Sequence, residues 1–270
     1  MSTPFRSGAF RLSPSDYSAL TDAAQQNPEA YWQNQSTRLD WIRSPSSAQD
    51  TGNGWFADGT LNASVNCLDR HLESRGEQTA LIWQAEEADH VVRLTYRDLH
   101  ARVCQMANVL RDHGISRGDR VAVHLPTVIE GVVGMLACAR LGAIHVVLFG
   151  GFSPEAIADR LADSGATLVI TANVGRRGAK RIPFKTTMDS ALSLRPETLS
   201  VRSVLVVSVT DESVPMQAGR DELLTPLLEK AETSCLAETM ASTDPLLLLY
   251  TSGSIGKPIG IVHGTGGFLQ

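Results

Sequence analysis

Short apolar runs alternate with stretches of helical periodicity along most of this chain, and this pattern limits the possible fold more than any other feature. The runs are rich in Val, Ile and Leu, as expected of strands buried on both faces; they span residues 80–83, 121–125, 144–148, 168–171, 204–207 and 246–250. Helices are expected between them, because Thr95 and Ser153 are capping residues before helical patterns and Gly114 and Gly142 end two others. Strands that alternate with helices predict an α/β fold with mostly parallel sheets flanked by helices.

The N-terminal part of the chain differs from the rest. Residues 1–60 are polar and contain two short helical patterns, each introduced by Ser13 or Asn27 before a proline at the first helical position. A further helix is expected over residues 62–76. We therefore expect an N-terminal helical or irregular extension at 1–60 and a larger unit over 61–270.

Composition excludes several classes of function. Lys and Arg number 24 against 29 Asp and Glu, and the net charge of −5 argues against a nucleic-acid surface or a polybasic membrane patch. The cysteines at 67, 104, 138 and 235 have no C-x-x-C spacing, and the seven histidines are dispersed, so neither a disulfide framework nor a metal site is expected. No apolar stretch approaches the roughly 20 residues that span a bilayer. A cytoplasmic location is expected.

A loop of small residues directly follows the apolar run at 246–250. Small side chains let backbone N–H groups approach a ligand, and hydroxyls with one cation add partners for phosphate oxygens. The residues expected to bind phosphate are Thr251, Ser252, Gly253, Ser254, Gly256 and Lys257. A hairpin turn is the alternative, in which residues 259–262 pair back onto the preceding strand.

Two common phosphate-binding motifs do not match this loop. The Walker pattern requires glycine five positions before Gly256 and Ser or Thr after the lysine, whereas this chain has Thr251 and Pro258 there. No G-x-G-x-x-G follows a predicted strand either. The loop therefore belongs neither to a P-loop NTPase nor to a Rossmann dinucleotide site.

The loop resembles the signature Y-T-S-G-S-T-G-K-P-K-G of the AMP-forming acyl-CoA synthetases, the adenylate-forming enzymes. Further segments resemble the acetyl-CoA synthetases of this group: residues 59–62, 66–71, 135–140, 149–156 and 263–267. The propionyl-CoA synthetases are the nearest alternative, although residues 66–71 look more like the acetyl type. By this resemblance, residues 61–270 are part of an AMP-binding, or adenylation, domain.

The resemblance implies an acetate–CoA ligase that uses ATP, Mg²⁺ and coenzyme A. Acetate attacks the α-phosphate of ATP to give acetyl-adenylate and pyrophosphate, and the CoA thiol then displaces AMP. Catalysis of the first half-reaction depends on neutralising phosphoryl charge, so the loop donors and the catalytic Lys257 are expected to hold the β- and γ-phosphates. The implied partners are small molecules only, without nucleic acid or membrane.

The same resemblance assigns residues to coenzyme A. Arg177 and Lys180, within a run of basic residues at 175–185, match positions that contact CoA phosphates, and cations without neighbouring acids suit a polyanion. Phe149, Gly150 and Gly151 resemble a wall of the CoA tunnel. The alternatives are a solvated surface loop for the basic run and a strand-to-helix turn that needs glycine for residues 149–151.

The chain departs from the family in two ways. Ile255 and Ile259 replace the usual Thr and Lys; a lost charge-assisted contact of about 1.5–3 kcal/mol would slow adenylation by roughly one to two decades. Family members also continue well beyond the position of Gln270, where the adenine, acetate and Mg²⁺ sites and the C-terminal domain would lie. We expect the isolated chain to be inactive, either as a fragment or as a non-catalytic remnant with weak CoA or nucleotide binding.

Overall fold

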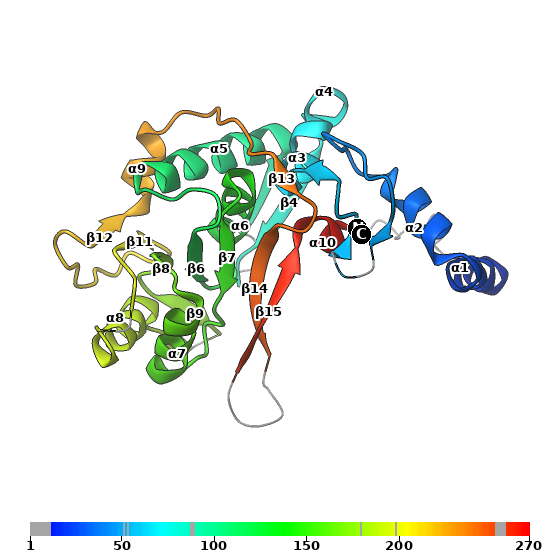
Figure 1. Ribbon diagram of the computed structural model, residues 1–270. Helices are drawn as coiled ribbons and strands as arrows, with labels where there is room; N and C mark the ends of the chain where they lie inside the picture. Colours follow the sequence, from blue (N-terminus) through cyan, green and yellow to red (C-terminus); the bar gives the residue numbers. More distant parts are fainter. Residues whose placement is uncertain are drawn as a thin grey trace.

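The centre of the molecule is one seven-stranded sheet (Figure 1). The computed structural model describes residues 12–50, 52, 54–86, 90–178, 180–197, 199–251 and 258–270. Along the sheet the strands are β12 (Asp221–Leu223), β11 (Ser203–Val207), β8 (Leu168–Ala172), β6 (Arg120–His124), β7 (Ile144–Val147), β14 (Pro245–Thr251) and β15 (Ile259–Gly264). All neighbours are parallel except β14 and β15. The α/β prediction is thus confirmed.

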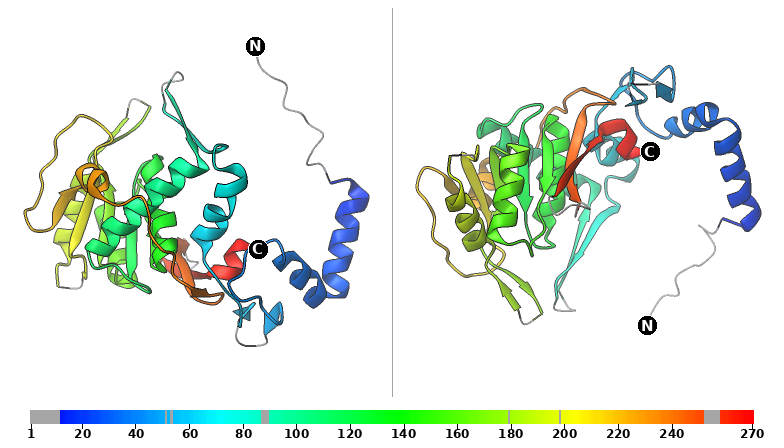
Figure 2. Two further views of the ribbon diagram at one scale, coloured as in Figure 1. Left: turned by 90° about the horizontal axis from the view of Figure 1, so that it is seen from above. Right: turned by 60° about the horizontal axis from the view of Figure 1, so that its bottom comes forward.

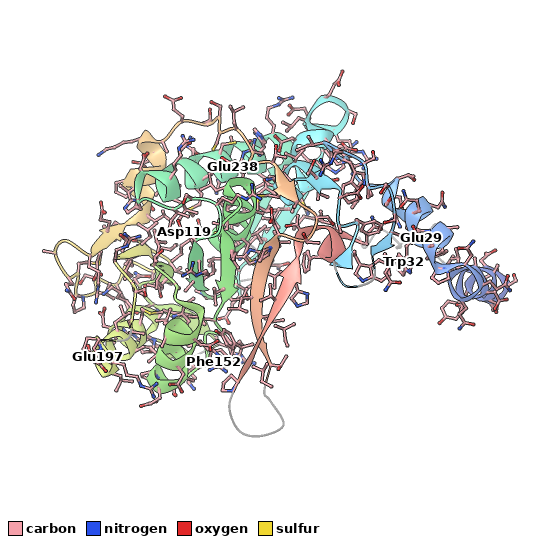
Figure 3. All side chains as sticks on the ribbon, viewed as in Figure 1. Glu29, Trp32, Asp119, Phe152, Glu197 and Glu238 are labelled. Atoms are coloured by element: carbon pink, nitrogen blue, oxygen red, sulfur yellow. The ribbon has the colours of Figure 1, made fainter. Side chains whose placement is uncertain are left out.

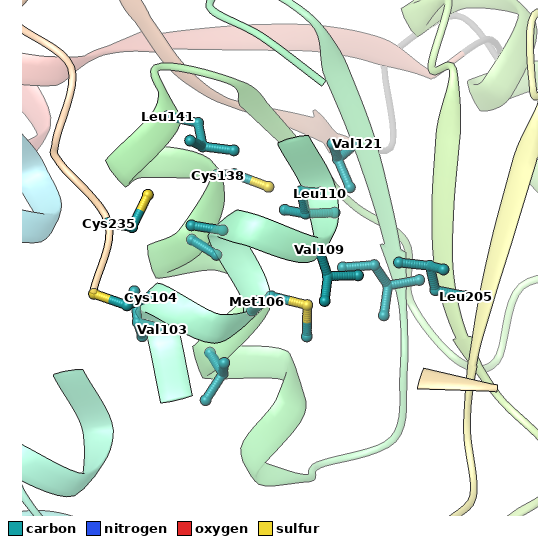
Figure 4. Packing of buried hydrophobic residues seen from close by; sticks show 14 of the residues in the cluster. Val103, Cys104, Met106, Val109, Leu110, Val121, Cys138, Leu141, Leu205 and Cys235 are labelled. Carbon is teal, nitrogen blue, oxygen red and sulfur yellow. The ribbon is translucent and has the colours of Figure 1, made fainter. Parts of the chain in front are cut away.

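Helices cover both faces of this sheet (Figure 2). In β8, Leu168 and Ile170 pack in one apolar cluster with α5 (Tyr96–Asp112), α6 (Ile129–Leu141) and α9 (Leu224–Lys230), whereas Val169 packs in a second cluster with α7 (Pro154–Ser164) and α8 (Phe184–Leu194). Alternate residues of a strand point to opposite faces, so an entirely apolar strand serves both layers. Figure 4 shows the first cluster, in which α5 and α6 pack together against Val121 and Leu205.

Local capping signals fix the helix starts as predicted. Ser13 and Asn27 cap α1 (Pro14–Gln26) and α2 (Pro28–Ser36), and Thr95 forms a capping box at α5. α1 buries no residue and lies apart from the sheet in Figure 2. None of the helices in the described residues combines the length and the apolar composition that crossing a bilayer would require. The domain division expected at residue 60 stays a prediction.

The strand predicted at 80–83 forms, but it does not join the parallel sheet. β4 (Thr79–Gln84) pairs antiparallel with β5 (Val91–Thr95) in a separate two-stranded sheet. The indole Nε1 of Trp83 donates to the carbonyl of Thr127 at 2.7 Å and holds this hairpin near the start of α6. The alternating pattern did not predict β5. β4 pairs with β5 and is not part of the seven-stranded sheet.

The helix predicted over residues 62–76 is broken into three short pieces. They are α3 (Ala63–Cys67), a 3₁₀ turn (Asp69–His71) and α4 (Leu72–Arg75). The backbone leaves the helical region at Leu68, with φ −126° and ψ −67°. The break comes directly before Asp69, whose carboxylate binds the buried guanidinium of Arg140 on α6. The remaining short elements near the chain ends are β1 (Gln49–Asp50), β2 (Gly54–Trp55), β3 (Thr60–Leu61), β13 (Met240–Ala241) and α10 (Thr265–Leu269).

Candidate functional site

The strand order brings the residues predicted for two different ligands to one edge of the sheet. β6, β7, β8 and β14 run parallel, so their carboxyl ends share that edge. Phe149, Gly150 and Gly151 follow β7, and Thr251 ends β14. The basic run follows β8. Open α/β sheets bind ligands outside the carboxyl ends of their strands, so this edge is the candidate site.

The loop of small residues connects the two strands of an antiparallel hairpin. Thr251 at the end of β14 lies opposite Ile259 at the start of β15, so the hairpin pairing considered as the alternative is confirmed. Thr251 is exposed at this end of the sheet. The other predicted phosphate ligands lie outside the described residues, and their roles stay predictions: Ser252, Gly253, Ser254, Gly256 and Lys257.

The basic run folds into a second small hairpin. β9 (Gly175–Arg177) pairs antiparallel with β10 (Lys180–Ile182), which places Lys180 opposite Arg177 and Arg181 opposite Arg176. All four side chains are exposed. Directly opposite residues share a face of a hairpin, so each face presents a pair of like charges. Such pairs are destabilising unless an anion lies between or beside them.

Acidic residues from other parts of the chain neutralise two members of the basic run. Arg181 forms an ion pair with Glu212 at 2.8 Å. Lys185 is fully buried rather than exposed, and its ammonium group pairs with Asp189 at 2.6 Å and Asp221 at 2.8 Å. Although no acidic residue lies within 175–185, these two side chains are thus paired with carboxylates from outside the run. Lys185 belongs to the interior.

The other three cations remain available at the surface. In the part of the chain that the structure describes, no carboxylate lies within ion-pair distance of Arg176, Arg177 or Lys180. The tip of the hairpin is held from outside, because the backbone N–H of Gly178 donates to Glu86 Oε1 at 2.6 Å. Among the described residues, the hairpin therefore presents Arg177 and Lys180 together at the candidate edge without a side-chain ion pair.

A buried ring that the sequence did not reveal joins the two segments predicted for coenzyme A. The side chain of Phe184 is 2% exposed and lies between two glycines. A Cβ placed on Gly150 would lie 2.6 Å from this ring, and one on Gly175 would lie 2.5 Å from it. Packing against Phe184 therefore requires glycine at position 150. This supports the alternative that residues 149–151 form a strand-to-helix turn that needs glycine. Phe149 nearby is 61% exposed and free to contact a ligand.

Two histidines beneath the edge are buried in the central strands. His124 at the end of β6 is fully buried, with Nδ1 3.3 Å from the hydroxyl of Thr171. Burial lowers the pKa of His124 to about 4 and that of His145 on β7 to about 4. Both rings are therefore neutral near pH 7.

A cluster of charged side chains at Asp69 links the turn after α3 to α6. Asp69 binds Arg140 through two hydrogen bonds of 2.8 and 2.9 Å and lies 3.4 Å from His100 Nε2. The hydrogen bond with Asp69 raises the pKa of His100 to about 9. Burial raises the pKa of Asp69, but His100 and Arg140 outweigh it and hold the pKa below its usual range. Arg70 pairs with Asp40 at 3.3 Å.

Two pockets lie away from the candidate edge. One of about 110 Å³ is lined by aromatic and small residues: Trp32, Trp55, Phe56, Gly267 and Gln270. The other, of about 300 Å³, is next to α8: Leu192, Ser193, Pro196, Leu199, Val201, Gln217 and Arg220. None of the residues predicted from sequence to bind ATP or coenzyme A lines either pocket.

The fold defines a class, an α/β protein with a mostly parallel sheet that is covered by helices on both faces. The chain belongs to the family of AMP-binding enzymes, whose pattern matches residues 68–270. Residues 17–67 match the N-terminus of acetyl-coenzyme A synthetase.

Curated relatives agree with this assignment. The chain is 46% identical to an acetyl-coenzyme A synthetase of Shewanella amazonensis over 260 residues, and 47% identical to one of Xylella fastidiosa over 261 residues. Each alignment covers 94% of this chain and 40% of the relative, so the chain spans about two fifths of their length. The crystal structure of a Brucella canis acyl-CoA synthetase superposes with a TM-score of 0.62 at 29% identity, covering 77% of this chain and 34% of that one.

Proposed function

We propose that this chain supplies ATP-phosphate and CoA-phosphate contacts of an acetate–CoA ligase that forms AMP. Membership of the AMP-binding enzymes and the names of the relatives support this proposal. The meeting of the predicted segments at one sheet edge supports it further. Acetate, rather than another acid, rests on the names of the relatives alone.

The observation that carries the proposal is the exposed pair of Arg177 and Lys180. These cations face each other across a hairpin without a carboxylate partner among the described residues. A polyanionic ligand would relieve their repulsion, and charge-assisted contacts to phosphate are among the stronger hydrogen bonds in proteins. Coenzyme A carries phosphate groups of this kind, and the exposed Phe149 would line its path.

For the first half-reaction, Thr251 and the loop that follows it would hold the β- and γ-phosphates of ATP, with Lys257 supplying positive charge. These contacts would stabilise the charge that develops on pyrophosphate while the acetate carboxylate attacks the α-phosphate. The CoA thiol would then displace AMP. Mg²⁺ would enter with the ATP phosphates; the described residues contain no group of three or more His, Cys, Asp or Glu suited to a metal, so no residue is assigned to it.

Calorimetric titration of the 270-residue chain with coenzyme A tests the CoA assignment. Arg177→Ala and Lys180→Ala should each weaken binding by about tenfold to a hundredfold, the effect of one charge-assisted contact. Arg102→Ala is the matched control, because Arg102 is an exposed arginine on α5. Unchanged CoA affinity in both variants would refute the assignment. Titration with dephospho-CoA shows whether the 3′-phosphate is the group recognised.

The ATP assignment has its own test. Lys257→Ala should weaken the binding of ATP and of inorganic pyrophosphate by a similar factor while CoA binding is unchanged. Equal affinity of both proteins for pyrophosphate would remove Lys257 from the site. A cytoplasmic location also remains a prediction.

A further inference from the structure

A buried arginine links the two proposed ligand segments. Arg160 lies in the middle of α7, the helix that follows residues 149–152 and is capped by Ser153. Arg160 is only 7% exposed. Its Nη1 donates to the carbonyl of Ala156 at 2.7 Å, and its buried Nε has no hydrogen-bond partner. Among the described residues, no carboxylate lies within ion-pair distance of it. A buried cation of this kind is costly unless other contacts compensate.

Aromatic rings supply the compensation. The guanidinium carbon lies 4.1 Å from the ring centroid of Phe152 and 5.4 Å from that of Tyr250. Both distances fall within the range of favourable cation–π contacts. Figure 3 labels Phe152 beside α7, and Tyr250 is the penultimate residue of β14. The arginine therefore contacts the segment after β7 and the end of β14 at once.

The contacts continue onto the other strand of the hairpin. Tyr250 donates its hydroxyl to Asp163 on α7 at 2.6 Å, which fixes the direction of its ring. Gly260 lies opposite Tyr250, and a Cβ placed on Gly260 would lie 3.3 Å from the ring. The ring thus covers β15 immediately after Ile259. Phe152, Arg160, Tyr250 and Gly260 form one continuous stack, which we name the Arg160 stack.

We propose that Arg160 is a positioning residue that holds both strands flanking the phosphate loop in a fixed relation to the segment that would line the CoA site. Its charge, rather than its size alone, maintains the stack, because the two rings gain their attraction from the cation between them. This role rests on the proposed function, since it predicts that pyrophosphate and CoA binding depend on the same buried side chain.

Amide hydrogen exchange of the ligand-free, full-length chain tests the stack directly. Arg160→Met, which keeps a long apolar side chain, should speed exchange by about tenfold in residues 149–153 and in residues 248–251, but not in β11. Arg160→Lys keeps the charge and should produce a smaller increase in both segments. Normal rates in Arg160→Met, an increase in only one segment, or an equal increase in β11 would each overturn the proposal.

Two further variants separate positioning from general destabilisation. Arg120→Met is the matched control, because Arg120 donates to the carbonyls of Ser164 and Gly165 at the end of α7 and has no recorded contact with the rings. It should leave both segments unchanged. If Arg160→Met does not fold, Phe152→Leu should still speed exchange across the stack in residues 248–251; wild-type rates there would refute the link.

Titration with inorganic pyrophosphate and with coenzyme A provides the functional readout. Arg160→Met should weaken both by about tenfold, whereas Arg120→Met should weaken neither. If the wild-type chain binds neither compound, the proposed function fails, but the exchange experiment still tests whether Arg160 holds the two segments together. If both compounds bind and Arg160→Met binds them with wild-type affinity, the positioning role is refuted.

Discussion

Acidification should destabilise this protein through two neutral histidines in its central strands. The pKa of His124 and of His145 is about 4 in the folded chain, because burial disfavours the charged ring, against about 6.5 in an unfolded chain. Between these values the unfolded state binds more protons. The stabilisation is therefore complete above about pH 6.5 and is lost as the pH falls toward 4.

The size of the effect follows from the two pKa values. Lowering the pH from about 7.5 to about 5 costs about 2 kcal/mol of unfolding free energy for each histidine. His124→Gln replaces the ring by a neutral side chain that does not titrate, so this variant should lose about 2 kcal/mol less than the wild type over the same interval. The combined variant with His145→Gln should lose about 4 kcal/mol less.

Urea unfolding at both pH values measures these differences. The comparison is made within each protein, so any loss of packing in a variant at neutral pH cancels. His90→Gln is the control, because His90 is exposed and lies outside the central strands. If His124→Gln loses as much stability on acidification as the wild type, the buried neutral ring is not the cause.

Three other perturbations have expected outcomes. The hydrogen bond with Asp69 raises the pKa of His100 to about 9, so protonated His100 stabilises the folded chain fully below about pH 6.5, and this stabilisation is lost as the pH rises through 9. The wild type should therefore lose about 2 kcal/mol of unfolding free energy between about pH 7.5 and 9.5, and His100→Gln should abolish this loss in urea unfolding. Lys185→Met removes the buried ammonium group from Asp189 and Asp221, both of which keep Arg220 as a partner, and should lower unfolding stability by about 1–3 kcal/mol, whereas the exposed Lys230→Met should not. Ile259→Lys should tighten pyrophosphate binding by about tenfold or more in calorimetry, and Ile261→Lys, on the same face of β15 but further from Thr251, should not.

Features that depend on neighbouring residues could be predicted from the sequence. Ser13, Asn27, Thr95 and Ser153 all cap helices, because a side-chain oxygen reaches a backbone N–H only two or three positions away. The run at 144–148 formed a strand inside the parallel sheet for a similar reason, since a short run that is apolar at all positions except His145 is typical of a strand buried on both faces.

Features that depend on distant partners could not be predicted in the same way. The run at 80–83 is a strand, but only its pairing with β5 shows that it lies outside the main sheet. The basic run gave no sign of a hairpin, because β9 and β10 lack apolar alternation. The burial of Phe184 could be suspected only from its residue type, since it is the one large aromatic residue within the basic run.

The candidate site shows the same division. Residue types at 177 and 180 indicated a phosphate ligand, but their position opposite each other on a hairpin required the fold. The separation of Lys185 from the exposed cations depended on Asp221, which is far along the chain. The link through Arg160 joins residues that no sequence spacing connects.

The two edge strands of the central sheet differ in how readily a further strand could pair with them. β12 has three residues and carries Asp221 and Glu222, features that discourage another strand from pairing there. β15 has six residues, none of which is Asp, Glu, Lys or Arg, and Ile259 and Val262 are 54% and 58% exposed. An incoming strand would thus add beside β15. It would then lie against β15, whose first residue, Ile259, is paired with Thr251 at the end of β14.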